Sequence, residues 1–303
     1  MKMLGLVGPT ASGKTHIALA LGARFGAEVV SVDSMQVYRG MDVATAKPSK
    51  SEQVRLPHHL IDLVEPGERF SVAEFQSHAL QCLKDLESRG ITPLLAGGSG
   101  LYLRAVIDEL EFPPTDAVVR AKLDARPTEE LWERLERVDP VAAAKMEPAN
   151  HRRTVRALEV IELTGKTFSS FRKAWDAYPA RGEKIVGLRL ADEVLRPRLV
   201  SRTTAMFSGA IQSEVTRLCN VGRRSALETT AAIGYRQALA LDEGVITRAE
   251  AIEQTVLASM QLARRQMRWF NRDPRIEWFD GADLERAARD IAAYWGGPPS
   301  GGE

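Results

Sequence analysis

The hydrophobic positions of this chain follow two alternating patterns. Short runs of consecutive apolar residues predict buried strands, and most are followed by a stretch with apolar positions at helical spacing. The predicted strands cover residues 3–7, 27–34, the start of 91–106, and 185–190. The predicted helices cover residues 14–26, 72–89, the end of 91–106, and a segment that begins near Asp192 or Glu193. Such alternation is typical of a parallel sheet with helices on both faces.

The segment between the third and fourth predicted strands has a different character. From Pro113 to about residue 184, only helical patterns rich in arginine and glutamate occur. After the fourth strand, the pattern is mainly helical until residues 274–279, which are a candidate edge strand. We therefore expect a core formed by residues 1–112 and 185–295, an inserted all-helical subdomain at 113–184, and a disordered tail at 296–303.

A glycine-rich loop joins the first predicted strand to the first predicted helix. Gly8, Gly13, Lys14 and Thr15 have the spacing G-x-x-x-x-G-K-[ST]. In such a loop, backbone N–H groups turn toward phosphate oxygens, the lysine neutralises their charge, and the threonine hydroxyl binds Mg²⁺. The sequence therefore predicts an α/β, P-loop NTPase-like parallel sheet core. The motif leaves open whose phosphate is bound, because hydrolases, kinases and other transferases all use it.

Polar residues follow the second predicted strand. Asp33, at its end, could bind a magnesium ion, act as a general base, or cap a turn. The polar side chains of residues 34–39 are suited to reading a base or a sugar, although an ordinary surface loop has the same composition. The Gly-Gly-Ser-Gly turn at residues 97–100 could line the same cleft or form a bare tight turn.

Charge, cysteines and histidines exclude several classes of protein. A formal net charge of +1 excludes a uniformly basic nucleic-acid coat but permits basic patches. Cys82 and Cys219 are too far apart in the sequence for a metal-ligand motif, which argues against a zinc or disulfide framework. Adjacent His58 and His59 cannot share one face of an element, so a structural role is favoured over a metal site. Without an apolar run of membrane-spanning length or a leader pattern, we expect a cytoplasmic protein with no membrane contact.

Arginines gather in three segments. Those near the start of residues 150–165, and those mixed with Trp269 and Phe270 in residues 262–272, are suited to RNA phosphates and bases. Charged helix faces are, however, usually only solvated. Arg198 and Arg202 lie four residues apart and share a predicted helix face, so they could clamp a second phosphate or form surface ion pairs.

Seven motifs together resemble the tRNA dimethylallyltransferases, also called isopentenyl-tRNA transferases. They occur in the order and approximate spacing of that family: GPTASGKT, SVDSMQVYRGMDVATAKP, PHHLID, LLAGGSGLY, RRTVRALEV, AIGYRQ and LARRQMRW. Ser99, where many members have threonine, and Arg268, where some have threonine, are small departures. The resemblance implies transfer of a dimethylallyl group from dimethylallyl diphosphate to N6 of adenosine 37 in tRNA. Diphosphate would be released, and Mg²⁺ would be the cofactor.

The resemblance also implies roles for individual residues. The diphosphate would be bound by Gly8, Pro9, Thr10, Ala11, Ser12, Gly13, Lys14, Thr15 and Arg202, with Mg²⁺ held by Thr15. The catalytic residues would be Lys14, Arg202 and Asp33, the last as the base that takes the N6 proton. The anticodon stem-loop of tRNA would contact Asp33, Ser34, Met35, Gln36, Ser99, Arg120, Arg152, Arg153, Thr154, Val155, Arg156, Gly234, Tyr235 and Arg236. The helical insertion would grip the anticodon stem, and we expect a monomer.

Three other functions use parts of the same pattern. A P-loop small-metabolite kinase would bind ATP and use Asp33 to orient an acceptor hydroxyl, but it gives no reason for the basic, aromatic segment 262–272. An adenylate prenyltransferase would share the diphosphate site but accept a free nucleotide, so it would not need the insertion. A non-enzymatic RNA-binding module would tolerate Asp33→Asn, which catalysis should not.

Overall fold

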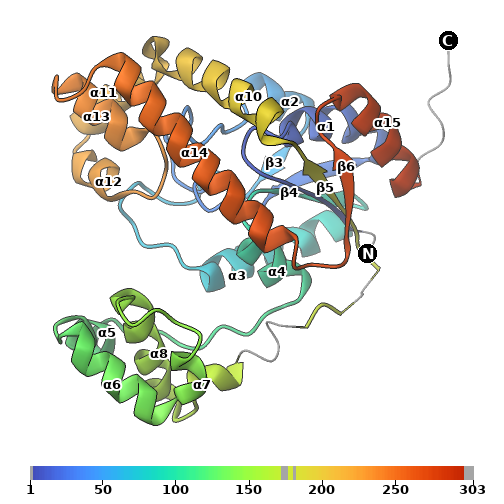
Figure 1. The fold of residues 1–303 in the computed structure, drawn as a ribbon. Helices are drawn as coiled ribbons and strands as arrows, with labels where there is room; N and C mark the ends of the chain where they lie inside the picture. Colours follow the sequence, from blue (N-terminus) through green and yellow to red (C-terminus); the bar gives the residue numbers. More distant parts are fainter. Residues whose placement is uncertain (1–2, 172–176, 180–181, 297–303) are drawn as a thin grey trace, which may run out of the picture. The chain divides into compact units, whose positions relative to one another are not determined.

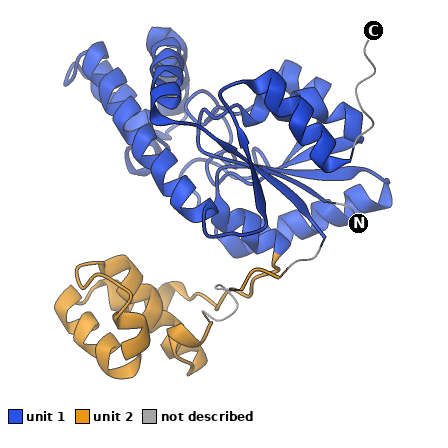
Figure 2. Ribbon diagram, turned by 45° about the vertical axis from the view of Figure 1, so that its right-hand side comes forward, with its two compact units in different colours: residues 1–107, 180–303 blue, residues 108–179 orange. Residues whose placement is uncertain are grey.

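The computed structural model describes residues 3–171, 177–179 and 182–296 of the chain. It divides into two compact units, one of residues 1–107 and 180–303 and one of residues 108–179 (Figure 2). The expected boundaries at 112/113 and 184/185 lie a few residues after the boundaries of these units. At the first boundary, the amino-acid composition changes only after the segment that connects the two units has begun. Of the expected disordered tail, residues 297–303 lie outside the described part of the chain.

Six parallel strands form the sheet of the first unit (Figure 1). They are β1 (Leu4–Val7), β2 (Ala27–Ser31), β3 (His58–His59), β4 (Thr92–Gly97), β5 (Lys184–Arg189) and β6 (Ile276–Asp280). Their order is β3-β2-β4-β1-β5-β6, and every pairing is parallel. The predicted α/β parallel sheet is confirmed, and the candidate edge strand is β6. The two-residue strand β3 is an addition, since the sequence analysis predicted no strand there.

Helices cover both faces of this sheet. Leu4 and Leu6 of β1 face a core formed with α1 (Lys14–Leu21) and α15 (Leu284–Trp295). Val7 faces the opposite core, formed with α3 (Val72–Ser88) and α4 (Gly100–Ile107). Alternate residues of β1 thus serve opposite cores, as buried parallel strands do. The structure also shortens the predicted helix 14–26, because a separate 3₁₀ turn, η1 (Ala23–Phe25), follows α1.

Seven further helical elements are described in the first unit. They are α2 (Lys50–Arg55), α10 (Asp192–Ala205), the π-helical turn η3 (Met206–Ala210), α11 (Ile211–Asn220), α12 (Arg224–Thr229), α13 (Tyr235–Asp242) and α14 (Arg248–Phe270). A capping box of Thr247 and Glu250 starts α14, which packs along α10 through Leu195, Val256 and Met260. The helices α11 and α13 share a third core with the loop after β2.

The second unit has a small core of its own. Its elements are α5 (Ala117–Asp124), α6 (Thr128–Val138), α7 (Pro140–Ala143), α8 (His151–Thr164) and the 3₁₀ turn η2 (Phe168–Phe171). Within the described part of this unit, only helical elements occur. Leu131, Leu135 and Leu158 form the centre of its core. Beside them, the fully buried Glu159 accepts hydrogen bonds from Arg120 and Arg156 at 2.7 and 2.8 Å.

Candidate active site

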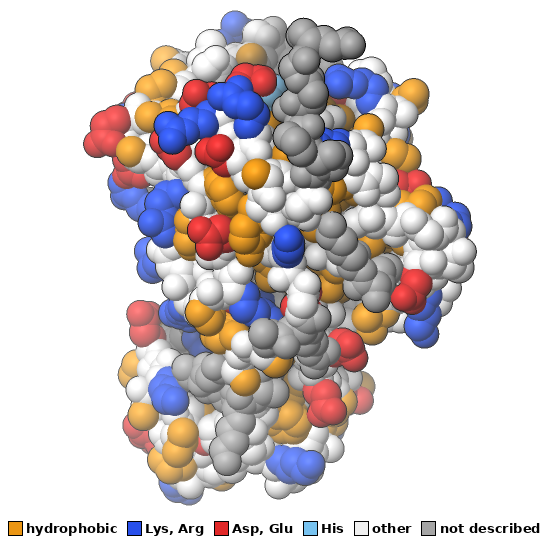
Figure 3. All heavy atoms as spheres, turned by 90° about the vertical axis from the view of Figure 1, so that its right-hand side faces the viewer, with side chains coloured by type: hydrophobic (Ala, Val, Ile, Leu, Met, Phe, Trp, Pro, Cys, Tyr) orange, Lys and Arg blue, Asp and Glu red, His pale blue; other side chains and the backbone are white. Residues whose placement is uncertain are grey.

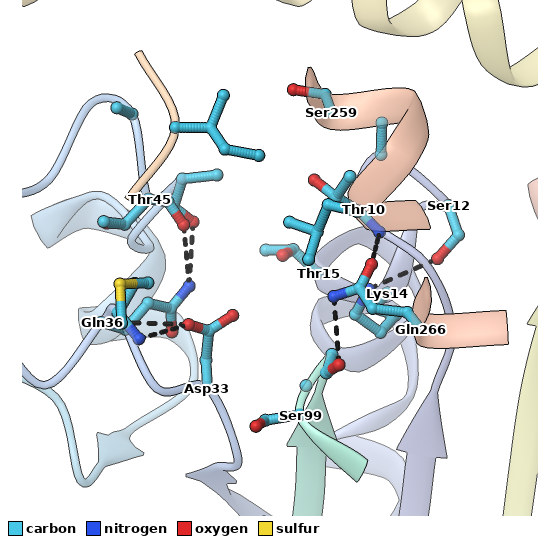
Figure 4. Close-up of a pocket in the computed structure, with 18 of the residues that line it drawn as sticks. Thr10, Ser12, Lys14, Thr15, Asp33, Gln36, Thr45, Ser99, Ser259 and Gln266 are labelled. Atoms are coloured by element: carbon cyan, nitrogen blue, oxygen red, sulfur yellow. Dashed lines mark hydrogen bonds between the residues drawn. The ribbon is translucent and has the colours of Figure 1, made fainter. Parts of the chain in front are cut away.

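The loops that follow β1, β2 and β4 meet at the carboxyl edge of the sheet. Because β4 lies between β1 and β2, the phosphate-binding loop, Asp33 and the Gly-Gly-Ser-Gly turn are close together there. They line a cavity of about 620 Å³ together with side chains of α10 and α14 (Figure 4). One cleft therefore holds the three motifs that the sequence placed at strand ends.

The backbone of the loop between β1 and α1 has the shape that an anion needs. Gly8 and Gly13 have φ of 151° and 97°, a region that favours glycine, and Ala11 has φ of 60°. Helix α1 begins at Lys14, and none of the described side chains caps its N-terminus. The N–H groups of its first turn can therefore bind an anion in the cavity.

Lys14 is folded back onto this loop. Its Nζ donates hydrogen bonds to the carbonyl oxygens of Gly8 at 2.9 Å and Pro9 at 2.7 Å. Burial lowers the pKa of Lys14 from 10.5 to about 8, an effect that the charge of Asp33 opposes and that of Arg202 strengthens. Among the described residues, the Lys14 ammonium hydrogen-bonds only uncharged groups, so a phosphate beside it would be strongly favourable.

Asp33 faces the phosphate-binding loop from the other side of the cavity (Figure 4). Its Oδ1 accepts hydrogen bonds from the backbone N–H groups of Met35 at 2.8 Å and Gln36 at 3.3 Å. These bonds close a turn and fix the carboxylate in one orientation. The turn-capping role that the sequence allowed is therefore present. It is compatible with a role as a base, since both bonds use the same oxygen.

The amide of Gln36 is used inside the loop. Its Oε1 accepts a hydrogen bond from Ser31 Oγ at 2.9 Å, and its Nε2 donates to the carbonyl oxygens of Thr45 at 3.3 Å and Ala46 at 3.2 Å. These bonds tie the two ends of the loop after β2 together. From the sequence, Gln36 was either a contact to substrate or part of an ordinary surface loop, and the structure shows this internal use.

Arg202 links the two sides of the cavity. From α10, its Nη1 donates to Thr10 Oγ1 in the phosphate-binding loop, and its Nη2 donates to the carbonyl of Ala44, both at 3.1 Å. Burial lowers the pKa of Arg202, and the charge of Asp33 opposes that effect. Arg198 also lines the cavity, but its Nη2 binds the carbonyl of Ala282 at 2.9 Å. The two arginines therefore have different partners in this structure.

Gln266 was not recognised from the sequence. Its Oε1 accepts a hydrogen bond from the backbone N–H of Thr10 at 2.9 Å, and its Nε2 donates to the carbonyl of Gly98 at 3.0 Å. A side chain of α14 thus joins the loop after β1 to the turn after β4 (Figure 4). The only signal for it was its place inside the LARRQMRW motif, in which the arginines drew attention instead.

The residues expected to contact tRNA occupy three kinds of environment. Cavity-lining positions are Asp33, Ser34, Met35, Gln36 and Ser99. Exposed side chains are those of Arg152, Arg153 and Arg236. Buried residues are Thr154, Val155, Gly234 and Tyr235, while Arg120 and Arg156 bind Glu159. Their contacts with RNA stay predictions, and the buried side chains would have to act indirectly.

The adjacent histidines have structural partners. His58 Nδ1 lies 2.7 Å from the carbonyl oxygen of Leu56, and His59 Nε2 lies 2.6 Å from Glu28 Oε2. Burial lowers the pKa of His58. Among the described residues, no group of three or more His, Cys, Asp or Glu side chains could hold a metal ion.

The surface carries both signs of charge. On the face in Figure 3, Lys and Arg side chains lie among acidic and hydrophobic ones, as a net charge of +1 leads one to expect. None of the helices within the described residues combines the length and the apolar character needed to cross a membrane.

Two family models match the chain. The model for IPP transferase matches residues 36–273, and the model for isopentenyl transferase matches residues 1–62. A tRNA dimethylallyltransferase of Corynebacterium glutamicum is 45% identical over 283 residues, which are 92% of this chain and 94% of that protein. One of Pseudarthrobacter chlorophenolicus is 43% identical over 291 residues, covering 95% of this chain and 96% of that protein.

Solved structures give the same grouping. A tRNA isopentenylpyrophosphate transferase of Bacillus halodurans is 36% identical, with a TM-score of 0.69, and the match covers 97% of this chain and 96% of that one. A eukaryotic dimethylallyltransferase solved acting on tRNA has a TM-score of 0.79 at 23% identity, covering 99% of this chain and 81% of that one. At that identity, the second match shows the fold alone.

Proposed function

This chain belongs to the tRNA dimethylallyltransferase family, and we propose that it transfers a dimethylallyl group from dimethylallyl diphosphate to N6 of adenosine 37 in tRNA. One observation carries the proposal. A phosphate-binding loop and a carboxylate, Asp33, face each other across a single cavity, with Arg202 reaching both sides. Transfer of a group with loss of diphosphate needs a site that binds the leaving diphosphate and, opposite it, a base that accepts the proton of the acceptor.

The diphosphate occupies the loop between β1 and α1. Backbone N–H groups of the phosphate-binding loop and of the first turn of α1, the Lys14 ammonium and the Arg202 guanidinium bind its oxygens. Lys14 exchanges the carbonyl oxygens of Gly8 and Pro9 for phosphate, and Arg202 turns from Thr10 toward the ligand. As the allylic C–O bond breaks, its electron pair leaves with the diphosphate, and these cations stabilise the developing charge.

Asp33 serves the acceptor. The N6 lone pair of the adenine forms the new C–N bond to the allylic carbon, and the N6 proton moves to the carboxylate of Asp33. Two backbone N–H groups bind Oδ1 and fix the orientation of the side chain, so that Oδ2 can take the proton. The base must first be unstacked from the anticodon loop to enter the cavity.

The donor set suits a magnesium ion bound with the substrate. Thr15 is exposed, lines the cavity at the start of α1, and offers one hydroxyl oxygen. Mg²⁺ prefers oxygen ligands, keeps several waters, and is commonly held by one or two protein groups together with phosphates. Bound there, it would neutralise the diphosphate and so favour its departure.

Exposed arginines serve the RNA. Arg152 and Arg153 on α8, and Arg236 on α13, are exposed and have no ion-pair partner within the described residues. They are suited to bind phosphates of the anticodon stem-loop, and the helical unit to grip its stem. A monomer in the cytoplasm is the expected form.

The test is a transfer reaction with two acceptors and a separate assay of ATP turnover. Purified protein and Mg²⁺ are incubated with dimethylallyl diphosphate and either unmodified tRNA or free AMP, and separately with ATP and no prenyl donor. Mass spectrometry of the digested products then detects N6-dimethylallyladenosine, which is adenosine with one added dimethylallyl group. We expect the group on adenosine of tRNA only. Prenylation of AMP alone would indicate an adenylate prenyltransferase, and ATP turnover alone a kinase.

Substitution of Asp33 tests the assignment of the base. Asp33→Asn keeps the size of the side chain and removes its capacity as a base, so transfer should fall roughly 10²–10⁴-fold. Binding of Mg²⁺-diphosphate should persist. Asp85→Asn, which makes the same chemical change on the exposed side of α3, should leave transfer unchanged. Full activity of Asp33→Asn would contradict the assignment.

A further inference from the structure

A buried tyrosine and a buried glutamate contact the loop after β2, part of which lines the cavity. Tyr235, at the start of α13, is fully buried, and Glu214, on α11, is 7% exposed. The Tyr235 hydroxyl donates a hydrogen bond of 2.6 Å to Glu214 Oε1. Burial and the charge of Glu214 raise the pKa of Tyr235, so the hydroxyl keeps its proton and stays a donor.

The other oxygen of this carboxylate holds the loop after β2. Glu214 Oε2 accepts hydrogen bonds from the backbone N–H groups of Asp42 at 3.0 Å and Val43 at 3.1 Å. Two successive residues of the loop, directly before Ala44, are thus attached to one carboxylate. Charge-assisted bonds of this kind are roughly twice as strong as neutral ones.

Ala44 and Arg202 connect the Tyr235–Glu214 pair to the phosphate-binding loop. The carbonyl of Ala44 accepts a hydrogen bond from Arg202 Nη2, while Arg202 Nη1 binds Thr10 in the phosphate-binding loop. The position of Ala44 therefore sets where the guanidinium of Arg202 lies. Neither Tyr235 nor Glu214 lines the cavity.

We propose that Tyr235 and Glu214 are positioning residues, which hold the segment 42–44 so that Arg202 is aimed at the diphosphate. The proposal rests on the proposed function, because it takes diphosphate to be the ligand of Arg202. Under this proposal, the tyrosine of the AIGYRQ motif acts through contacts within the protein. It also separates Tyr235 from its exposed neighbour Arg236, which remains a candidate for direct contact with RNA.

A double-mutant cycle on ligand binding tests this directly. Calorimetry measures the affinity of the full chain for inorganic diphosphate with Mg²⁺, in wild type, Tyr235→Phe, Arg202→Lys and the double variant. Loss of one hydrogen bond should weaken binding about 2–10-fold in Tyr235→Phe. In the Arg202→Lys background, the same change should cost less than about twofold, because the two residues then no longer act through each other.

Two controls make the result specific. Tyr294→Phe removes a hydroxyl from a half-exposed tyrosine on α15 and should not change the affinity. Glu214→Gln keeps the shape and removes the charge, so it should reproduce the coupling with Arg202 if Tyr235→Phe folds poorly. An equal loss of affinity in both Arg202 backgrounds, or no loss in either, would overturn the proposal.

Transfer kinetics separate the proposal from a direct contact between Tyr235 and tRNA. Tyr235→Phe should raise KM for dimethylallyl diphosphate and leave KM for tRNA unchanged. A rise in KM for tRNA alone would refute the positioning role. Wild-type protein that binds diphosphate but does not modify tRNA would contradict the proposed function, while the binding cycle would still decide whether the pair acts through Arg202.

Discussion

The buried ammonium of Lys14 makes diphosphate binding depend on pH in a predictable way. In the ligand-free chain the pKa of Lys14 is about 8 instead of 10.5, mainly because the group is buried. At 1.36 kcal/mol for each pKa unit, the empty loop disfavours the charged form by about 3 kcal/mol. A diphosphate beside the ammonium favours that form, so binding raises the pKa again. Affinity should therefore be constant below pH 8 and fall above it.

The size of the fall follows from the fraction of charged lysine. At pH 9, one unit above the pKa, only about one tenth of Lys14 carries its proton before binding. The affinity should then be about tenfold below its plateau, unless the ligand-bound pKa is already reached. Calorimetry with Mg²⁺-diphosphate from pH 6.5 to 9.5 measures this directly. Ionisation of the ligand itself changes over the same range and needs a control.

Lys14→Arg provides that control. Arginine stays protonated throughout the range, so its curve contains only the ionisation of the ligand and of other groups. Binding to Lys14→Arg is expected to be weaker, but the ratio of wild-type to variant affinity should be flat below pH 8 and decline above it. A ratio that is constant from pH 6.5 to 9.5 would refute the lowered pKa of Lys14.

Four further substitutions, at three residues, test other parts of the structure. Gln266→Ala breaks the connection between the phosphate-binding loop and Gly98 and should weaken diphosphate binding about tenfold by calorimetry, and Gln266→Glu should do so more, because it places a carboxylate against the Gly98 carbonyl. Trp295→Ala removes a buried side chain from the core between α1 and α15 and should lower the free energy of unfolding in urea by about 3–5 kcal/mol. Glu159→Gln leaves two arginine side chains without their buried carboxylate and should destabilise the helical unit by about 3–5 kcal/mol, measured by hydrogen exchange of α8.

Much of the fold could be predicted because local signals agreed with tertiary structure. The apolar runs gave β1, β2, β4 and β5, and the phosphate-binding motif required the strand and helix around it. Residues 274–279 were a short edge-strand candidate, and they supply most of β6, which pairs with β5 at the edge of the sheet. The strand β3 has only two residues, His58 and His59, and so had no hydrophobic period to detect.

Residues of the cavity could be predicted from the sequence where a local motif marks them. They could not be predicted where their contacts are with residues far away in the sequence. Asp33 could be placed in this cavity because it follows a buried strand, and its role as a base stays a prediction. Glu214 and Gln266 could not, because their partners lie 172 and 256 residues away. Nothing in the local sequence marks Glu214, and Gln266 is marked only by its place in the LARRQMRW motif. For Tyr235, the AIGYRQ motif indicated importance but not burial. The sequence alone does not show whether a tyrosine at the start of a helix faces RNA or a hydrophobic core.

The central claim is most directly tested on a pair of synthetic anticodon stem-loops that differ only at adenosine 37. Each is incubated with the protein, Mg²⁺ and dimethylallyl diphosphate, and the intact RNA is weighed by mass spectrometry. The account predicts a gain of one dimethylallyl group on the RNA with adenosine at that position and no gain when guanosine replaces it. Equal modification of both RNAs, or of neither while diphosphate still binds, would contradict it.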